Sequence, residues 1–205
     1  LIGSDKGYAW FLVVQMLSTA SRVATPFYIL YVMKLFHQTE DGSGGLKVAL
    51  AFLANQAWLS LAYLGADTGS NLVWGYLGDK TGFRLVLLLA IVTWAAATWL
   101  LMTVHTPWAI IAAFCGLGAG QSGYNMAVQT MILEFGHRDD LPMRVAISTT
   151  AEAITATLGP LIGGQVADWL GYPTVFGLSI GVLASAILIL VALVKEPRSA
   201  RLAAL

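Results

Sequence analysis

The sequence predicts an all-α membrane protein, a bundle of six transmembrane helices. Hydrophobic residues make up 58% of the 205-residue chain and charged residues only 11%, and the mean hydropathy is +0.74. A soluble globular domain usually carries about 25% charged residues. Six apolar stretches are each long enough for the roughly 20 helical residues that a bilayer core requires. They are residues 8–36, 46–78, 83–104, 107–135, 143–168 and 172–195.

A soluble helical bundle is the competing interpretation. It would need a charged face on every helix, but residues 85–104 and 169–194 contain no Asp, Glu, Lys or Arg. The turns between the stretches are too short to hold a soluble domain, so we expect one transmembrane domain over residues 1–205. Acidic and basic residues balance at 11 each, which favours no nucleic-acid partner.

The basic residues predict that both termini face the cytoplasm, because cytoplasmic loops are enriched in Lys and Arg. If six helices alternate in direction, only Lys34 and Lys47 fall near the outer side. Eight others fall on the opposite side: Lys6, Lys80, Arg84, Arg138, Arg144, Lys195, Arg198 and Arg201. We therefore expect a multi-pass protein of the cell membrane, in contact with lipid.

A short motif occurs twice in the chain. Residues 75–83 and 164–172 both read G-x-[LV]-small-D-x-x-G-aromatic, at a constant offset of 89 residues. Three helices and their loops account for this offset, so the two copies must point in opposite directions across the membrane. Inverted three-helix repeats are typical of secondary transporters. We predict such repeats over about 8–104 and 107–195, with chance similarity as the alternative.

The first copy also resembles a known family. Residues 75–84, GYLGDKTGFR, resemble the signature loop of the major facilitator superfamily, G-x-L-[GA]-D-[RK]-x-G-[RK]-[RK], except that Phe83 replaces a second basic residue. Residues 116–120, 159–164 and 195–198 resemble further segments of the family, so the resemblance covers nearly the whole chain.

The resemblance implies a secondary active transporter of a small solute that works by alternating access. Members have twelve helices in two halves, so the chain is expected to be one six-helix half, with the C-terminal half favoured and the other half as its partner. A short protein that pairs with itself or with another half is the alternative. In the family the signature loop braces the cytoplasmic gate; here that role falls on Gly75, Gly78, Asp79, Lys80, Gly82 and Arg84. The other interpretation is that these charges only set orientation.

Three ionisable residues, Arg22, Asp67 and Glu152, are expected at bilayer depth, where each costs about 2.5–3.5 kcal/mol on insertion scales. They lie in polar stripes at helical spacing on the first, second, fourth and fifth stretches. The third and sixth stretches carry only scattered Ser and Thr and are expected to face lipid. The predicted substrate and ion pathway consists of Arg22, Asp67, Asn71, Gln121, Asn125 and Glu152.

Within this pathway, Arg22 is expected to attract an anionic substrate group or to exchange partners between Asp67 and Glu152. A medium of low dielectric constant favours the neutral form of a carboxyl group, so both carboxylates are candidates for coupling to H⁺. The alternative is an ion pair that only keeps Arg22 satisfied. Pro26 cannot donate a hydrogen bond to the Arg22 carbonyl, which predicts a kink and a free backbone acceptor.

Three glycine pairs at small-xxx-small spacing predict close helix contacts: Gly65/Gly69, Gly116/Gly120 and Gly159/Gly163. No catalytic or metal-binding arrangement is predicted, because His37, His105 and His137 lie far apart in the sequence. We therefore expect neither an enzyme nor a cofactor. The alternative function is a channel-like or structural six-helix membrane protein without coupled transport.

Overall fold

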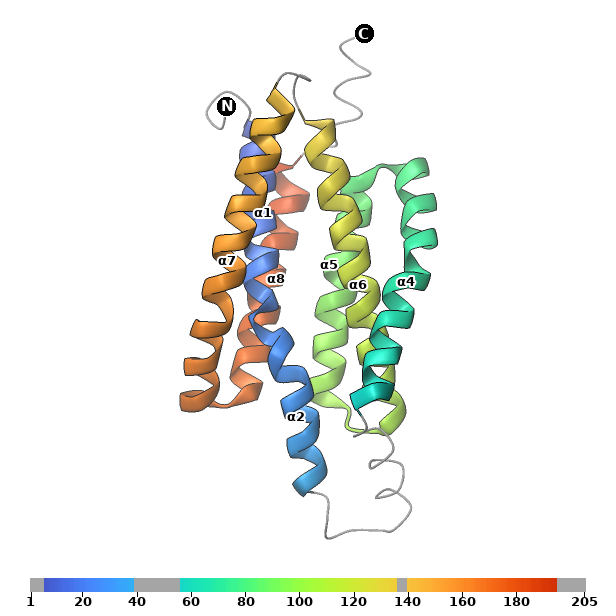
Figure 1. Cartoon of the computed structure of the whole chain (residues 1–205), viewed down its shortest axis with the longest axis vertical. Helices are drawn as coiled ribbons and strands as arrows, with labels where there is room; N and C mark the ends of the chain where they lie inside the picture. The colour runs from blue at the N-terminus through green and yellow to red at the C-terminus, as the bar shows by residue number, and fades with distance from the viewer. Residues whose placement is uncertain (1–5, 39–55, 136–139, 195–205) are drawn as a thin grey trace.

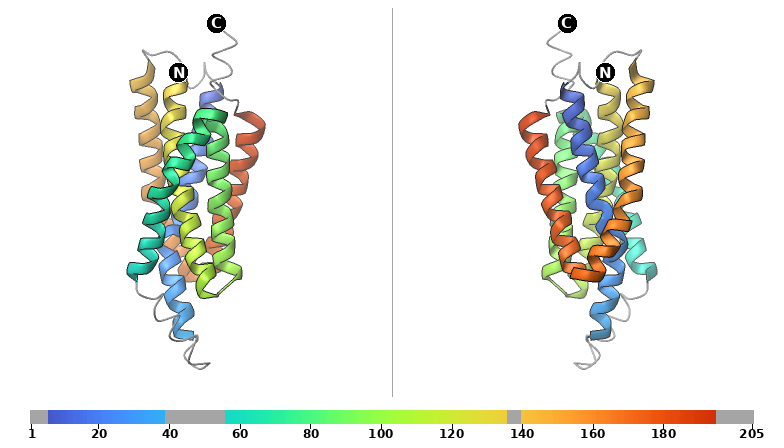
Figure 2. Two further views of the ribbon diagram at one scale, coloured as in Figure 1. Left: turned by 90° about the vertical axis from the view of Figure 1, so that its right-hand side faces the viewer. Right: turned by 90° about the vertical axis from the view of Figure 1, so that its left-hand side faces the viewer.

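The chain forms a bundle of six helical segments. The computed structural model describes residues 6–38, 56–135 and 140–194. The first segment is divided into α1 (Lys6–Ser21), the 3₁₀ turn η1 (Arg22–Ala24) and α2 (Thr25–Gln38). The others are α4 (Gln56–Thr81), α5 (Phe83–Thr103), α6 (Pro107–Glu134), α7 (Leu141–Leu170) and α8 (Tyr172–Leu193). They run roughly along the long axis of the molecule in every view (Figures 1 and 2), and the predicted all-α six-helix fold is confirmed.

Three described helices, α5, α7 and α8, are long and apolar enough to cross a membrane by length and composition. The helices α4 and α6 have 26 and 28 residues and carry polar side chains, among them Asp67 and Asn125. The first segment is divided by η1. Glu152, a predicted pathway residue, lies on α7, so a polar pathway residue occurs in a helix with the composition of a membrane span.

The helices pack as two groups, with α1, α7 and α8 in one and α4, α5 and α6 in the other (Figure 1). Contacts between α5 and α8 join the groups. Each group mixes the two predicted repeats, because α6 belongs to the second repeat and α1 to the first. Helices α4 and α7 lie at opposite edges of the bundle (Figure 1) and expose large apolar side chains such as Leu72 and Leu161.

Single glycines join two of the helix pairs. Gly82, between α4 and α5, has φ 91° and ψ 155°, and Gly171, between α7 and α8, has φ 82° and ψ 164°. Glycine adopts such positive φ values without the steric penalty of a side chain. The Gly82 amide donates to the Gly78 carbonyl at 2.9 Å, and the Gly171 amide donates to the Ala167 carbonyl at 3.0 Å.

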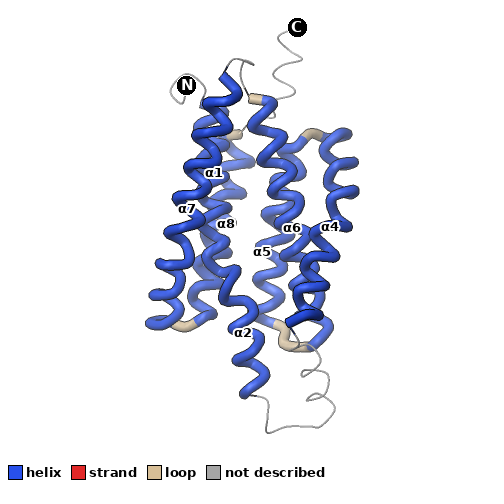
Figure 3. Tube along the Cα trace, viewed as in Figure 1, coloured by secondary structure: helices blue, strands red, loops and turns tan. Residues whose placement is uncertain are grey.

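These two joints lie at opposite ends of the bundle (Figure 3). Gly82 and Gly171 are separated by the same 89 residues as the two copies of the sequence motif. Equal backbone conformation, equal hydrogen bonding and opposite placement are what a duplicated and inverted three-helix unit would have. The joints therefore support the predicted inverted repeat.

The first segment bends near Pro26, as predicted, but the break lies at residues 22–24. The expectation of a free acceptor is wrong, because the Thr25 amide donates to the Arg22 carbonyl. This hydrogen bond spans three residues, as in a 3₁₀ turn, instead of the four of an α-helix. Such bonds satisfy carbonyl groups that an α-helix leaves without a partner.

The Gly159/Gly163 pair is a close helix contact, as predicted. A Cβ atom on Gly159 would lie 2.8 Å from a methyl group of Val23, and one on Gly163 would lie 2.1 Å from the other. Real Cβ contacts are essentially never this short, so a side chain on Gly163 would force Val23 to shift. The absence of side chains lets α7 approach the break in the first segment.

The Gly116/Gly120 pair packs against α5, where a Cβ on Gly116 would lie 2.9 Å from that of Ala97. Gly65 and Gly69 form no such contact within the described residues, where a Cβ at either would meet nothing within 4 Å. The close approach between α4 and α6 occurs at Gly118 instead. There a Cβ would lie 2.1 Å from the Tyr63 carbonyl oxygen.

The third and sixth stretches, which form α5 and α8, were expected to face lipid, but both helices also pack in the interior of the bundle. Each has an exposed side and a side that reaches the interior. Trp94 on α5 is only 4% exposed, and the Ser179 hydroxyl on α8 donates to the Ser21 carbonyl at 2.9 Å. The sequence contained too few polar residues on these helices to indicate their inner side.

Helix α1 begins and α8 ends at the same end of the bundle (Figure 1). This agrees with two termini on one side of a membrane. Several residues of the topology argument lie outside the described residues, and so does His137. They are Lys47, Arg138, Lys195, Arg198 and Arg201.

Candidate functional site

A polar cluster lies at the break in the first segment. Arg22 Nη1 forms an ion pair with Glu152 Oε1 at 3.3 Å, and Arg22 Nη2 donates to Asn125 Oδ1 at 3.4 Å. Asn125 is on α6 and Glu152 on α7, so Arg22 connects the two helix groups. The side chains of Arg22 and Glu152 remain 22% and 30% exposed, which leaves the ion pair accessible at one side.

A second donor reaches the same carboxylate from α1. Gln15 Nε2 donates to Glu152 Oε2 at 3.3 Å, and Ser148 Oγ donates to Gln15 Oε1 at 2.6 Å. Gln15 is 1% exposed, and its amide is fully oriented by these two contacts. Gln15 lies two helical turns before Arg22, and Ser148 one turn before Glu152, so helical spacing is the signal that could have added both to the site.

Two aromatic rings pack against the guanidinium group of Arg22. Its Cζ atom lies 4.4 Å from the ring centroid of Tyr124 and 5.6 Å from that of Trp94. Such cation–π contacts stabilise a partly desolvated cation by about 0.5–2 kcal/mol. The Tyr124 hydroxyl donates to the Gln15 carbonyl at 3.3 Å and lies 3.1 Å from Thr19 Oγ1.

Sequence reasoning missed both rings. Trp94 and Tyr124 are 4% and 1% exposed and lie in apolar stretches, where an aromatic residue is normally part of the core. The one local signal was at Tyr124, which directly precedes the polar Asn125 in the sequence.

Four of the six predicted pathway residues are connected. Gln121 Nε2 donates to Asn125 Oδ1 at 2.9 Å, so this oxygen accepts from Gln121 and Arg22. Asn71 instead donates to the backbone carbonyl of Asp67 at 2.9 Å. Asp67 is half-buried, and within the described part of the chain its carboxylate has no hydrogen-bond partner. Arg22 is therefore paired with Glu152 and not with Asp67.

At the predicted cytoplasmic end, Arg84 connects the start of α5 to the end of α8. Its Nη2 atom donates to the carbonyl oxygens of Leu190 at 3.3 Å and Val191 at 2.9 Å. Carbonyls in the last turn of a helix lack partners within the helix, and a cation is favourable at this end of the helix dipole. The predicted gate motif thus contacts the last helix through Arg84.

The glycines of this motif make close packing possible. A Cβ on Gly78 would lie 2.4 Å from the Phe83 ring. Phe83, which departs from the family pattern, therefore occupies the space that Gly78 leaves open. Gly75 is half-buried, and its Cβ would lie 4.0 Å from Met126 Sδ on α6.

The charged residues of the motif lie at the surface. Lys80 Nζ donates to the Tyr76 hydroxyl and lies 4.3 Å from the centroid of the Tyr76 ring. Asp79 is exposed beside it. Lys80 is therefore held along its own helix, one turn from Tyr76, while Arg84 reaches across to α8.

Comparison with known proteins identifies relatives. The sequence model of the Major Facilitator Superfamily matches residues 10–204. The multidrug resistance protein MdtG of Serratia proteamaculans is 27% identical over 174 residues, which are 83% of this chain and 39% of that protein. The uncharacterized MFS-type transporter Rv1877 of Mycobacterium tuberculosis is 29% identical over 158 residues, which are 73% of this chain and 22% of that protein. The chain spans less than half the length of these relatives.

Proposed function

Since this chain belongs to the major facilitator superfamily, a family of membrane transporters, we propose that it forms one half of a secondary active transporter. The transporter would carry a small solute by alternating access. The family assignment indicates a transporter rather than an enzyme. Both termini would lie in the cytoplasm, and a second six-helix half would cover the exposed apolar sides of α4 and α7.

The observation that supports this proposal most directly is the Arg22–Glu152 ion pair with its bridge to Asn125. Alternating access requires groups of helices to move against each other. Arg22 and Glu152 belong to the same helix group, whereas Asn125 belongs to the other. A relative movement of the groups would break the Arg22–Asn125 contact and keep the ion pair, so Asn125 is the exchangeable partner.

Protonation supplies a second step. A proton on Glu152 would remove the negative charge that holds Arg22, and the guanidinium group would then be free to attract an anionic group of the substrate or the Asp67 carboxylate. Asp67 and Glu152 are therefore our candidates for coupling to H⁺. The uncommitted carboxylate of Asp67 supports its role as the second partner.

The transport test uses Arg22→Ala and, separately, Glu152→Gln in the whole protein. One relative is named a multidrug resistance protein, so the first assay is export of fluorescent organic compounds from loaded cells, with anionic dyes among them because Arg22 is proposed to attract an anionic group. A hydrogen bond to a charged group is worth about 1.5–3 kcal/mol, so each variant should lose transport by roughly tenfold or more.

Membrane amounts of both variants should stay near those of the wild type, as measured by immunoblot of isolated membranes. The matched control is Gln129→Ala, an exposed amide on α6 two helical turns from the Gln121 contact. Wild-type transport in both site variants would overturn the assignment of the polar cluster to the pathway.

A further inference from the structure

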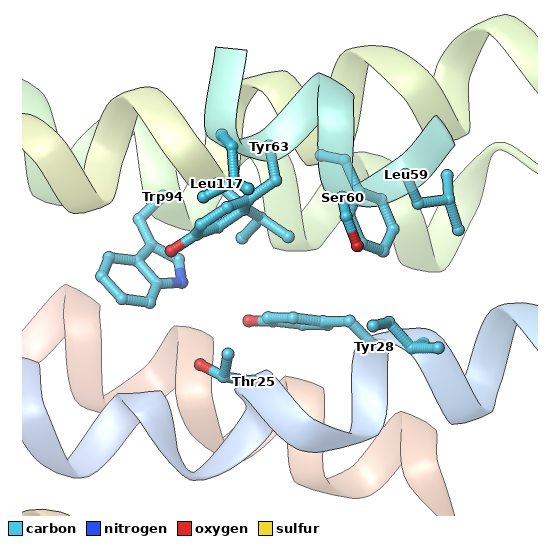
Figure 4. A pocket seen from close by; sticks show the side chains of 10 residues that line it. Thr25, Tyr28, Leu59, Ser60, Tyr63, Trp94 and Leu117 are labelled. Carbon is cyan, nitrogen blue, oxygen red and sulfur yellow. The ribbon is translucent and has the colours of Figure 1, made fainter. Parts of the chain in front are cut away.

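A separate cavity of about 320 Å³ lies beyond the polar cluster, between α2, α4, α5 and α6. Figure 4 shows ten side chains that line it, and none of the ten is charged. Its walls are mostly apolar, with the rings of Tyr28 and Tyr63 on opposite sides (Figure 4). Small-molecule sites in proteins usually have volumes of about 300–1,000 Å³, so this cavity has room for a compact organic molecule.

The cavity contains hydroxyl groups that are not committed elsewhere. Thr25, Ser60 and Tyr63 line it, and their hydroxyls form no hydrogen bond within the described residues. The indole Nε1 of Trp94 is buried and also has no partner there. By contrast, the Tyr28 hydroxyl is 2.8 Å from Thr98 Oγ1. Thr25 and Ser60 are exposed, so their hydroxyls need no partner in the protein. Buried polar groups are normally hydrogen-bonded, so the unpaired Trp94 indole, beside the half-buried Tyr63, points to a ligand.

The polar groups gather at one end. The hydroxyls of Tyr28 and Tyr63 are directed toward the Trp94 indole, while Leu59 lies at the other end (Figure 4). The Trp94 ring also contacts Arg22, so this indole separates the apolar cavity from the ion pair. A ligand would therefore place a polar group beside Trp94 and an apolar body toward Leu59.

We propose that this cavity binds an uncharged organic molecule with an apolar body of one or two rings and a single hydrogen-bond acceptor, to which the Tyr63 hydroxyl donates. A charged ligand is disfavoured, because no lining side chain would compensate the cost of removing its charge from water. The inference rests on the proposed function only in making the cavity a part of the transport pathway. Its test measures binding, so a failure of transport would not affect the result.

The probe is benzophenone, which has two rings and one carbonyl acceptor and which bonds to nearby C–H groups on irradiation. The whole protein in lipid nanodiscs is labelled over a range of concentrations, and adducts are located by peptide mass spectrometry. We expect saturable labelling of Leu59 and Leu117, which line the cavity and are each only 2% exposed. Diphenylmethane, the same skeleton without the carbonyl, should compete about two- to tenfold more weakly, the ratio expected for one hydrogen bond.

Two matched variants test the donor. Tyr63→Phe removes an unbonded hydroxyl, so it should raise the half-saturating benzophenone concentration to the level of diphenylmethane. Tyr28→Phe removes a hydroxyl that is engaged with Thr98, so the preference for the ketone should remain. Equal loss of this preference in both variants would overturn the assignment of Tyr63 as donor.

A second pair of variants tests whether the ligand binds in this cavity. Ser60→Trp fills the cavity and should abolish saturable labelling, whereas Leu188→Trp adds the same side chain at a position 70% exposed and should leave it unchanged. Labelling that rises without saturation, or that spreads equally to exposed residues such as Leu133, would show occupation by lipid and overturn the proposal. Unchanged labelling in Ser60→Trp would also overturn the proposal.

Discussion

Arg22, in the 3₁₀ turn η1, forms an ion pair with Glu152 at 3.3 Å. The first residue belongs to the first predicted repeat and the second to the other, so this ion pair is one of the contacts that join the two repeats where the first segment is broken. The η1 turn directs the arginine toward α7, and Gly159 and Gly163 let α7 come close enough to receive it.

The first prediction concerns the coupling between these charges. Breaking a buried pair on one side costs about 3–5 kcal/mol, and solvent exposure reduces this cost. We expect Arg22→Ala and Glu152→Ala each to lower the free energy of unfolding by about 2–3 kcal/mol. The double variant should lose less than the sum, because no unpaired charge remains.

Chemical unfolding in detergent micelles measures the free energy of unfolding of the wild type, the two single variants and the double variant. The control combines Glu152→Ala with Arg84→Ala at the end of the bundle, where the effects should add within about 0.5 kcal/mol. Additive losses for Arg22 and Glu152 would argue against a direct ion pair.

The second prediction concerns the aromatic surface beneath Arg22. Tyr124→Phe removes the hydroxyl that contacts Gln15 and Thr19 but keeps the ring, and should cost about 1 kcal/mol of unfolding free energy. Tyr124→Leu also removes the cation–π contact and should cost at least about 0.5 kcal/mol more. Thermal unfolding monitored by circular dichroism separates the two; equal losses would show that the ring contributes nothing beyond its volume.

The third prediction concerns the gate motif. Asp79→Asn should shift the populations of the inward- and outward-open states more than it weakens substrate binding, because the residue lies at the end of the bundle and away from the polar cluster. Spin labels at both ends of the bundle would report the populations of the two states, and equilibrium binding would be measured in parallel. Weaker affinity with an unchanged distribution of states would contradict the gate role.

The fourth prediction concerns the glycine joints. Alanine at Gly82 or Gly171 should lower the free energy of unfolding by more than about 1 kcal/mol, because a Cβ is strained at positive φ. The two losses should be similar, since the backbone conformations are nearly the same. Gly181→Ala, in a helix with nothing within 4 Å of the new Cβ, is the control and should be neutral or stabilising. A neutral Gly171→Ala would contradict the strain argument.

The fifth prediction concerns the contact between α7 and η1. Gly163→Ala should be destabilising because its Cβ would lie 2.1 Å from Val23, and overpacking typically costs about 1–3 kcal/mol. Val23→Ala should restore part of this loss in the double variant. Gly164→Ala, whose Cβ would meet nothing within 4 Å, provides the comparison. A double variant as unstable as the sum of the single ones would exclude the steric explanation.

Much of the fold could be predicted because its signals are local. Hydropathy and turn residues place the third stretch at 83–104, and α5 is Phe83–Thr103. The position of the break in the first segment could not be predicted from Pro26 alone. A missing amide weakens the helix, but whether a 3₁₀ turn forms before it depends on how η1 packs against α7.

The site was predictable in part. A charged residue in a bilayer requires partners, so the grouping of Arg22 with Asn125 and Glu152 followed from their polar stripes. The choice between Glu152 and Asp67 did not follow, because it depends on the rotation of α4. The α4 helix packs against α6 where Gly118 lies close to the Tyr63 backbone, a contact that leaves no trace in the spacing of polar residues. The contact of Trp94 with Arg22 could not be predicted either, because a tryptophan in an apolar core and one that packs against a cation have the same apolar sequence neighbours.

The one-residue joints also bear on how the chain enters a membrane. Among the described residues, α5 has the length and composition of a membrane span, whereas α4, which precedes it across Gly82, is less apolar. Two helices connected by one residue cannot be separated by the thickness of a bilayer. They are therefore expected to leave the insertion machinery together as a helical hairpin, in which the apolar second arm carries the polar first arm across.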